Sequence, residues 1–165
     1  MASNQPTQAI NVVKSDTINI PEPDAYITGA NTARFGGASI VTPFAKFLGT
    51  FNPAATGYSN RVSVGDVVYQ GTTMVTVVSV DSDTALTLSG AITAGGATYE
   101  IYRANTANSE GFSLFVGGQG NISVVPVSSD QTVIMQNIPD SSFIPLQVKR
   151  VNLANTTATN IIALR

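Results

Sequence analysis

Residues 112–125 read FSLFVGGQGNISVV, and this stretch is the strongest indication of β structure in the chain. Two runs rich in β-branched and aromatic residues, 112–116 and 121–125, flank the glycine-rich segment 117–120. Such runs are typical of strands, and glycine supplies the positive φ that a tight turn needs. We therefore predict an antiparallel hairpin here. A phosphate-binding loop is excluded, because neither a Lys-Ser/Thr pair nor a helical pattern follows.

The same kind of pattern continues to the end of the chain. Val133 and Met135 lie at alternate positions within 132–136, and apolar residues alternate with polar ones over 144–149, where Pro145 indicates a strand start or an edge. Residues 159–165 read as a final strand. Antiparallel hairpins with one polar and one apolar face pack as a sandwich or a barrel, so we expect a C-terminal β module over 111–165.

A second module precedes this one, over residues 51–103. It contains five short strand-like runs, separated by turn residues such as the Asp-Ser-Asp segment 81–83 and the pair Gly95-Gly96. Short strands at this spacing predict a small, partly closed β-barrel. Residues 104–110, ANTANSE, have no apolar periodicity, and we expect them to form a linker.

The first 50 residues are the least regular part of the chain. Residues 17–20 alternate as a short strand that Pro21 ends, and 38–48 is a weak helix candidate. We expect an extended arm, 1–50, with short edge strands, which makes the whole chain all-β: an arm followed by two small antiparallel modules. The arm carries apolar side chains that we predict to bind a partner: Ile18, Ile20, Tyr26, Ile27 and Phe35.

The composition removes most of the groups that enzymes use. The chain has no His and no Cys, so Ser-His and Cys-His couples, disulfides and Cys-based zinc sites are all excluded. Asp81 and Asp83 resemble a divalent-cation pair, but turn formation explains them better. We expect no catalytic residue, no cofactor and no metal, and hence a protein that is not an enzyme.

Charge is scarce throughout. Eight Lys and Arg and ten Asp and Glu make up 11% of the 165 residues, under half the share of an ordinary soluble domain, which is about a quarter. The basic pair Lys149-Arg150 stands alone, so no nucleic-acid partner is expected. No apolar run is long enough for a membrane helix, and the polar start lacks the features of a secretion signal. A surface so poor in charge is suited to contact with other protein.

The C-terminal module carries a resemblance to a known class of proteins. The segments that carry this resemblance are GGQGNI (117–122), IP (138–139), FIPLQVKRV (143–151) and NTTATNIIAL (155–164). This pattern resembles the C-terminal module of small β-rich virion proteins of tailed bacteriophages, and it covers about a third of the chain. The resemblance implies a virion component: a head decoration protein, a head fibre, a spike base or a tail accessory protein.

From the resemblance and the low charge we expect a capsid decoration (cement) protein that bridges neighbouring subunits. It would lie on the outer capsid surface of the virion after assembly in the bacterial host cytoplasm. The expected partners are the major capsid protein and further copies of this chain, as a homotrimer. One alternative is a structural component of the tail, neck or fibre base. Another is a carbohydrate-binding adhesion module, which the absence of Trp disfavours.

Overall fold

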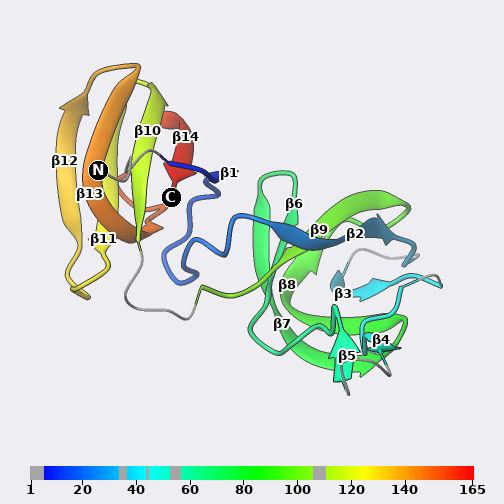
Figure 1. Cartoon of the computed structure of the whole chain (residues 1–165). Helices are drawn as coiled ribbons and strands as arrows, with labels where there is room; N and C mark the ends of the chain where they lie inside the picture. Colours follow the sequence, from blue (N-terminus) through cyan, green and yellow to red (C-terminus); the bar gives the residue numbers. More distant parts are fainter. Residues whose placement is uncertain (1–5, 34–36, 44, 53–56, 106–110) are drawn as a thin grey trace. The chain divides into compact units, whose positions relative to one another are not determined.

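A computed structural model describes residues 6–33, 37–43, 45–52, 57–105 and 111–165. It divides the chain into two compact units, and each is described by itself (Figure 1). Unit 1 comprises Met1–Pro23 and Asn105–Arg165, and unit 2 comprises Asp24–Ala104. The described residues form antiparallel strands and no helix, so the all-β prediction with two antiparallel modules is confirmed.

Unit 1 is built on one six-stranded sheet with the order β1-β14-β10-β13-β11-β12. The strands are β1 (Ala9–Asn11), β10 (Phe112–Gly118), β11 (Gly120–Pro126), β12 (Val133–Ile138), β13 (Ser142–Val151) and β14 (Thr159–Leu164). Alternate residues of the central strands are buried, as the period-two pattern requires. The buried side chains include Phe112, Leu114, Val116, Ile122, Val124, Ile144, Val148 and Ile161.

The predicted hairpin at 117–120 is wrong as a pairing, although both of its strands exist. β10 pairs with β13 and β14, and β11 pairs with β12 and β13, so β13 lies between β10 and β11. The glycines serve a close approach instead. A Cβ on Gly120 would lie 2.5 Å from the backbone nitrogen of Ala158, and one on Gly118 would collide with Oγ1 of Thr159. The segment that leads into β14 therefore packs directly on this turn.

The N-terminal residues are part of unit 1. β1 pairs antiparallel with β14, with Ile10 opposite Ala163. Further along, the backbone N–H of Ser15 donates to the carbonyl of Val151 at 3.0 Å. The Lys14 ammonium donates to the carbonyls of Thr156 and Ala158, at 3.3 and 3.2 Å. The segment that leads to Pro23 is thus held along unit 1, where we expected it to extend away.

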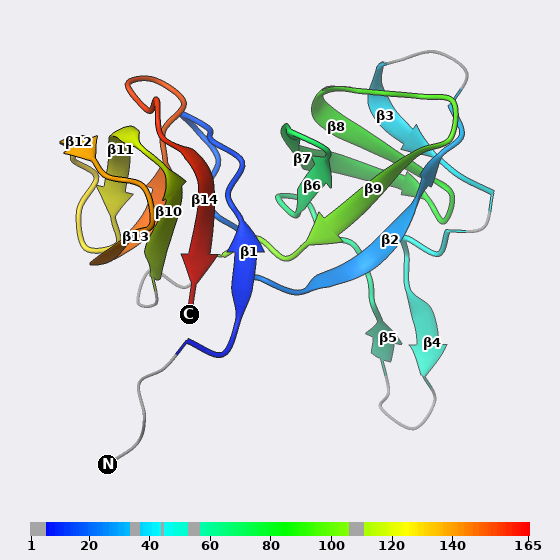
Figure 2. The same cartoon turned by 90° about the horizontal axis from the view of Figure 1, so that it is seen from above.

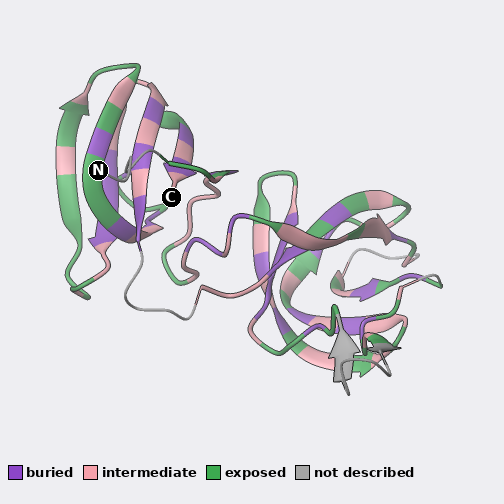
Figure 3. Cartoon of the chain, viewed as in Figure 1, coloured by how far each residue is buried: buried purple, intermediate pink, exposed green. Residues whose placement is uncertain are grey.

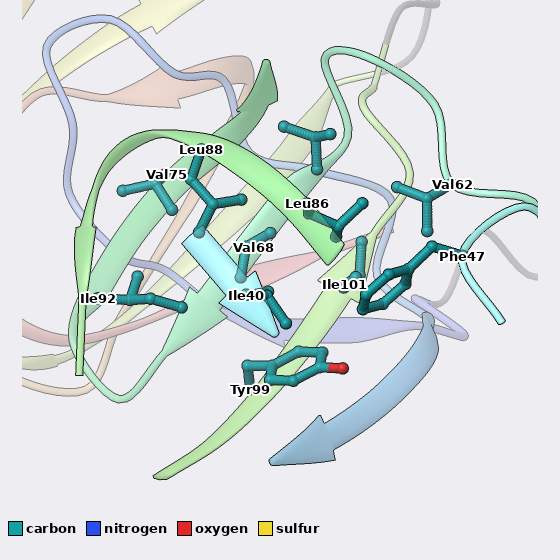
Figure 4. Packing of buried hydrophobic residues seen from close by; sticks show 11 residues of the cluster. Ile40, Phe47, Val62, Val68, Val75, Leu86, Leu88, Ile92, Tyr99 and Ile101 are labelled. Carbon is teal, nitrogen blue, oxygen red and sulfur yellow. The ribbon is translucent and has the colours of Figure 1, made fainter. Parts of the chain in front are cut away.

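Unit 2 contains a second six-stranded sheet, with the order β2-β9-β6-β7-β8-β3, which curls into a half-barrel (Figure 2). Its strands are β2 (Ala25–Asn31), β3 (Gly37–Val41), β6 (Val67–Gln70), β7 (Thr73–Ser82), β8 (Ala85–Ile92) and β9 (Ala97–Tyr102). A short ribbon, β4 (Thr50–Asn52) with β5 (Gly57–Ser59), accompanies it. The core packs Ile40, Phe47, Val68, Leu86, Tyr99 and Ile101 together inside the curl (Figure 4).

The two edges of this half-barrel meet at Asn31, which is fully buried. Its side-chain amide donates to the carbonyls of Ser39 and Thr93, each at 3.2 Å. Its side-chain oxygen accepts from the backbone N–H groups of Ala33 and Val41, at 3.1 and 3.2 Å. One side chain therefore joins the end of β2 to β3 and satisfies four backbone groups.

The expected boundaries differ from the units in the structure. The segment 1–50 is divided, since its first part joins unit 1 while β2 and β3 complete the half-barrel of unit 2. Of the weak helix candidate 38–48, residues 38–41 form most of β3 and residues 43, 47 and 48 lie in turns, while residue 44 is outside the described part of the chain. Of the expected linker 104–110, residues 106–110 lie outside the described part of the chain.

Candidate interaction surface on unit 1

The residues predicted to bind a partner do not form one surface. Ile18 is half-buried and Ile20 is only 2% exposed, with its backbone N–H bonded to the carbonyl of Lys149 at 2.9 Å. Tyr26 and Ile27 lie in β2 and pack against the core of unit 2. Phe35 lies outside the described residues. Partner binding by these side chains therefore stays a prediction, and Ile20 is covered in this structure.

Tyr26 belongs instead to a polar cluster around Asp66, a carboxylate that is 4% exposed. The Tyr26 hydroxyl and the Arg103 guanidinium both donate to Oδ2 of Asp66, at 2.6 and 3.0 Å, and the backbone N–H of Ser63 donates at 2.8 Å. The guanidinium also lies 3.8 Å from the centre of the Tyr26 ring. Such a saturated arrangement fixes the start of β6 and leaves the carboxylate little room for a ligand.

The pKa of Tyr26 fits this structural role. Burial, followed by the hydrogen bond to Asp66, raises the pKa of its hydroxyl far above the ordinary value. The hydroxyl is therefore a neutral donor at any physiological pH. A tyrosine that acts as a base needs a lowered pKa, so the cluster does not point to catalysis.

The candidate cation pair is also occupied by local bonds. Asp81 accepts from the hydroxyls of Ser79 and Thr87, at 2.6 and 2.8 Å, and these bonds lower its pKa. Asp83 accepts from the backbone N–H of Leu48 at 3.1 Å. Across the described residues, no group of three or more acidic side chains is placed to hold a metal ion.

The part of the chain that the structure describes contains no helix that is long and apolar enough to cross a membrane.

The most distinctive exposed feature is β12, the outermost strand of the unit 1 sheet (Figures 1 and 3). Two of its β-branched side chains face solvent, since Val133 is 39% and Ile134 is 47% exposed. Residues 131–138 carry no charged side chain and no proline. Natural edge strands usually carry charged residues or proline as protection, because an open edge is a template for pairing with another chain. An unprotected edge of this kind indicates a site of association.

A row of apolar side chains crosses the same sheet. Phe143 in β13 lies opposite Phe115 in β10, and Phe115 lies opposite Ile162 in β14. Cross-strand partners share one face of a sheet, so the three side chains form a continuous row. Phe143 is 54% exposed, and the other two are half-buried. A large aromatic ring left in solvent at the end of such a row is typical of a protein contact.

A polar pocket of about 450 Å³ opens beside β12. It is lined by Asp16, Ser123, Thr132, Ile134, Arg150, Asn152, Ala154 and Asn155. Hydrogen bonds hold its floor in place: Asn152, which is 7% exposed, donates to the hydroxyls of Ser123 and Thr132 at 3.1 and 3.3 Å. Nε of Arg150 donates to the Asn152 oxygen at 3.1 Å.

The pocket presents both a donor and an acceptor. Oδ1 of Asp16 accepts from the backbone N–H of Ala154 at 2.9 Å, so the carboxylate is held at the rim. Of the ion pairs formed within the described ranges, none joins Asp16 to Arg150. A group that both donates and accepts, such as an amide or a pair of hydroxyls, suits these two side chains.

Comparison of the chain with protein-family models, curated proteins and solved structures gives no match. Sequence reasoning missed the open edge at β12, although one signal was present. Residues 133–135 are three consecutive apolar residues, which an alternating strand with one solvated face does not contain.

Proposed function

We propose that this chain is a non-enzymatic structural component of a bacteriophage virion, and specifically a capsid decoration protein that binds the major capsid protein on the outer shell. The low charge and the resemblance of the C-terminal module to virion proteins support this proposal. So does the saturation of the buried polar groups around Asp66 by bonds within the chain.

The observation that carries the proposal is the exposed aromatic end of the apolar row at Phe143. Covering a phenylalanine that is 54% exposed contributes about 1 kcal/mol to association. One such contact is weak. A shell offers many equivalent sites, and protein bound to the folded shell stabilises it by mass action. The Phe143 contact can therefore be only one part of the interface that holds each copy on the shell, because association itself costs about 4 kcal/mol or more.

The test is binding to purified capsids that lack this protein. We expect the full chain to co-sediment with such particles and to raise the temperature at which they rupture. The variant Phe143→Asp should lose most of this binding, since a carboxylate cannot be covered by an apolar partner without a large desolvation cost. Val78→Asp is the matched control, because Val78 is 50% exposed on β7 of unit 2. Equal binding by both variants would reject Phe143 as the contact.

Copy number separates the two virion locations. Quantitative gel densitometry of intact particles should give a copy number comparable to that of the major capsid subunit for a decoration protein. About a dozen copies or fewer would assign the chain to the tail, neck or fibre base.

The polar pocket favours a different class, a carbohydrate-binding module. Its Asp16, Arg150 and Asn152 side chains are of the kind that bind sugar hydroxyls, but none of its lining residues is aromatic. Binding to a glycan array that Asn152→Ala abolishes would favour this alternative over the shell contact.

A further inference from the structure

The open edge at β12 is short and regular. β12 pairs with β11 in register from Val133, opposite Val124, to Met135, opposite Ile122. The register then shifts, so that Ile138 lies opposite Gly120, and Asn137 adopts a left-handed φ of 53°. An extra residue in this conformation is a β-bulge, which twists the strand and ends regular pairing. The edge available to another strand is therefore centred on Ile134.

The sequence of this edge is symmetric about Ile134. It reads Gln131-Thr132, then Val133-Ile134-Met135, then Gln136-Asn137: two polar residues, three apolar residues and two polar residues. An antiparallel pair reverses one strand relative to the other. A pattern that is the same in both directions therefore matches a second copy of itself.

Placing Ile134 on a two-fold axis makes this match explicit. Ile134 then lies opposite Ile134 of the second copy, and Val133 lies opposite Met135 of the second copy. Thr132 lies opposite Gln136 of the second copy. Apolar residues thus face apolar residues, and polar face polar. No charged residue falls within 131–138, so the two copies meet without like-charge repulsion.

The polar pocket adds an independent observation. Thr132 and Ile134 both line it, so it opens on the face of β12 from which these two side chains project. Gln136 of a second copy, opposite Thr132, would project from that same face. Its amide can donate to the Asp16 carboxylate and accept from the Arg150 guanidinium. Each copy would then supply a side chain to the pocket of the other.

We infer that two copies of this chain associate through antiparallel pairing of their β12 strands about Ile134, with Gln136 of each copy entering the polar pocket of the other. The result is one continuous sheet across the two-fold axis. The inference deepens the proposed function, because it names the partner of this edge, but the pairing itself needs no virion.

The contact is small, since it uses about five residues a side. Interfaces of this size belong to weak, transient associations. We therefore expect a dimer that forms only at high protein concentration in solution, and that is favoured where many copies are held close together on a shell.

The first test is sedimentation velocity of the full chain over a range of concentrations. The weight-average mass should rise with concentration from 17.1 kDa towards twice that value. Ile134→Lys places two ammonium groups together on the axis, so this variant should stay at the monomer mass at every concentration. Val78→Lys, at a comparably exposed strand position, should behave as the wild type. A species at three times 17.1 kDa that Ile134→Lys leaves intact would contradict the inference and favour the predicted homotrimer.

Disulfide trapping tests the register and does not depend on the lysine variant. The chain has no cysteine, so one introduced thiol can pair only with a second copy. Under mild oxidation Ile134→Cys should give a covalent dimer at least tenfold faster than Thr132→Cys. In the inferred register the two Thr132 positions lie four residues apart along the paired strands, about 13 Å, which is beyond disulfide reach.

Equal trapping of the two variants, or a mass that stays at 17.1 kDa without trapping, would overturn the inference. Neither result would contradict the proposed function, which is tested separately by shell binding through Phe143.

Discussion

Replacing Asn31 with alanine should destabilise unit 2 strongly, because this one side chain joins the two edges of the half-barrel. The substitution removes four hydrogen bonds and leaves the carbonyls of Ser39 and Thr93 and the N–H groups of Ala33 and Val41 without their side-chain partner. A buried hydrogen bond contributes about 0.5–1.5 kcal/mol. Water that enters the space left by the amide replaces some of these hydrogen bonds and recovers part of the lost free energy. We expect a loss of about 3 kcal/mol in the free energy of unfolding.

The assay uses a property of the composition. The chain has five Tyr and no Trp, and all five Tyr (26, 58, 69, 99 and 102) fall within Asp24–Ala104. Tyrosine fluorescence during urea unfolding therefore reports on unit 2 alone. With a slope of about 1 kcal/mol per molar urea for a unit of this size, the midpoint should fall by about 3 M.

Thr32→Ala is the matched control. Its hydroxyl donates to the carbonyl of Val41 at 2.6 Å, but the bond is exposed, so water replaces it and the midpoint should move little. A midpoint shift for Asn31→Ala that is no larger than the shift for Thr32→Ala would contradict this role of the Asn31 side chain.

Two further predictions concern the glycine-rich turn and the buried tyrosines. Gly120→Ala should destabilise unit 1 by about 2 kcal/mol or more, because its Cβ would meet the Ala158 backbone nitrogen at 2.5 Å. Thermal unfolding followed by far-UV circular dichroism measures this loss of stability. Gly95→Ala has open space around its Cβ and a φ of 75°, so it should cost only the backbone strain, about 1 kcal/mol; equal losses would argue against the close approach. Burial raises the pKa of Tyr99 to about 12, and burial also raises the pKa of Tyr102. Because the pKa of Tyr99 is higher in the folded state than in the unfolded state, its contribution to the free energy of unfolding is fully present below the unfolded-state pKa of about 10. This contribution is lost as the pH rises towards 12. Absorbance titration of the phenol groups should show these two ionising only above pH 11 or on unfolding, and ordinary titration near pH 10 in the folded protein would contradict the burial.

Local strand formation was predictable because it depends on neighbouring residues. β-Branched and aromatic runs broken by Gly, Pro, Asp and Ser indicated strands at 112–116, 121–125 and 159–165, and the structure has β10, β11 and β14 there. The partners of these strands were not predictable in the same way. Residues 117–120 look like a hairpin turn, yet β13 lies between the strands that they connect. Glycine permits a tight turn and a close approach equally well, and only the position of Thr159 shows which one is used.

The candidate surface, too, was only partly predictable from the sequence. Unbroken apolar residues at 133–135 and the absence of charge around them are visible in the sequence, and they indicate an association site once β12 is known to be an edge. Nothing local distinguishes an edge strand from a central one. The pocket that joins Asp16 to Arg150 brings together residues far apart in the chain, and no spacing rule predicts it.

Strand propensity and composition are properties of each residue and its immediate neighbours, and for this reason the amino-acid sequence was enough to predict an all-β chain that is poor in ionic groups. The three-dimensional structure was needed to show that β1 lies against β14, with Ile10 opposite Ala163, and that β12 is left at an open edge. Strand pairing satisfies backbone groups without regard to sequence distance. Which strand finds which partner is therefore settled by packing over the whole unit.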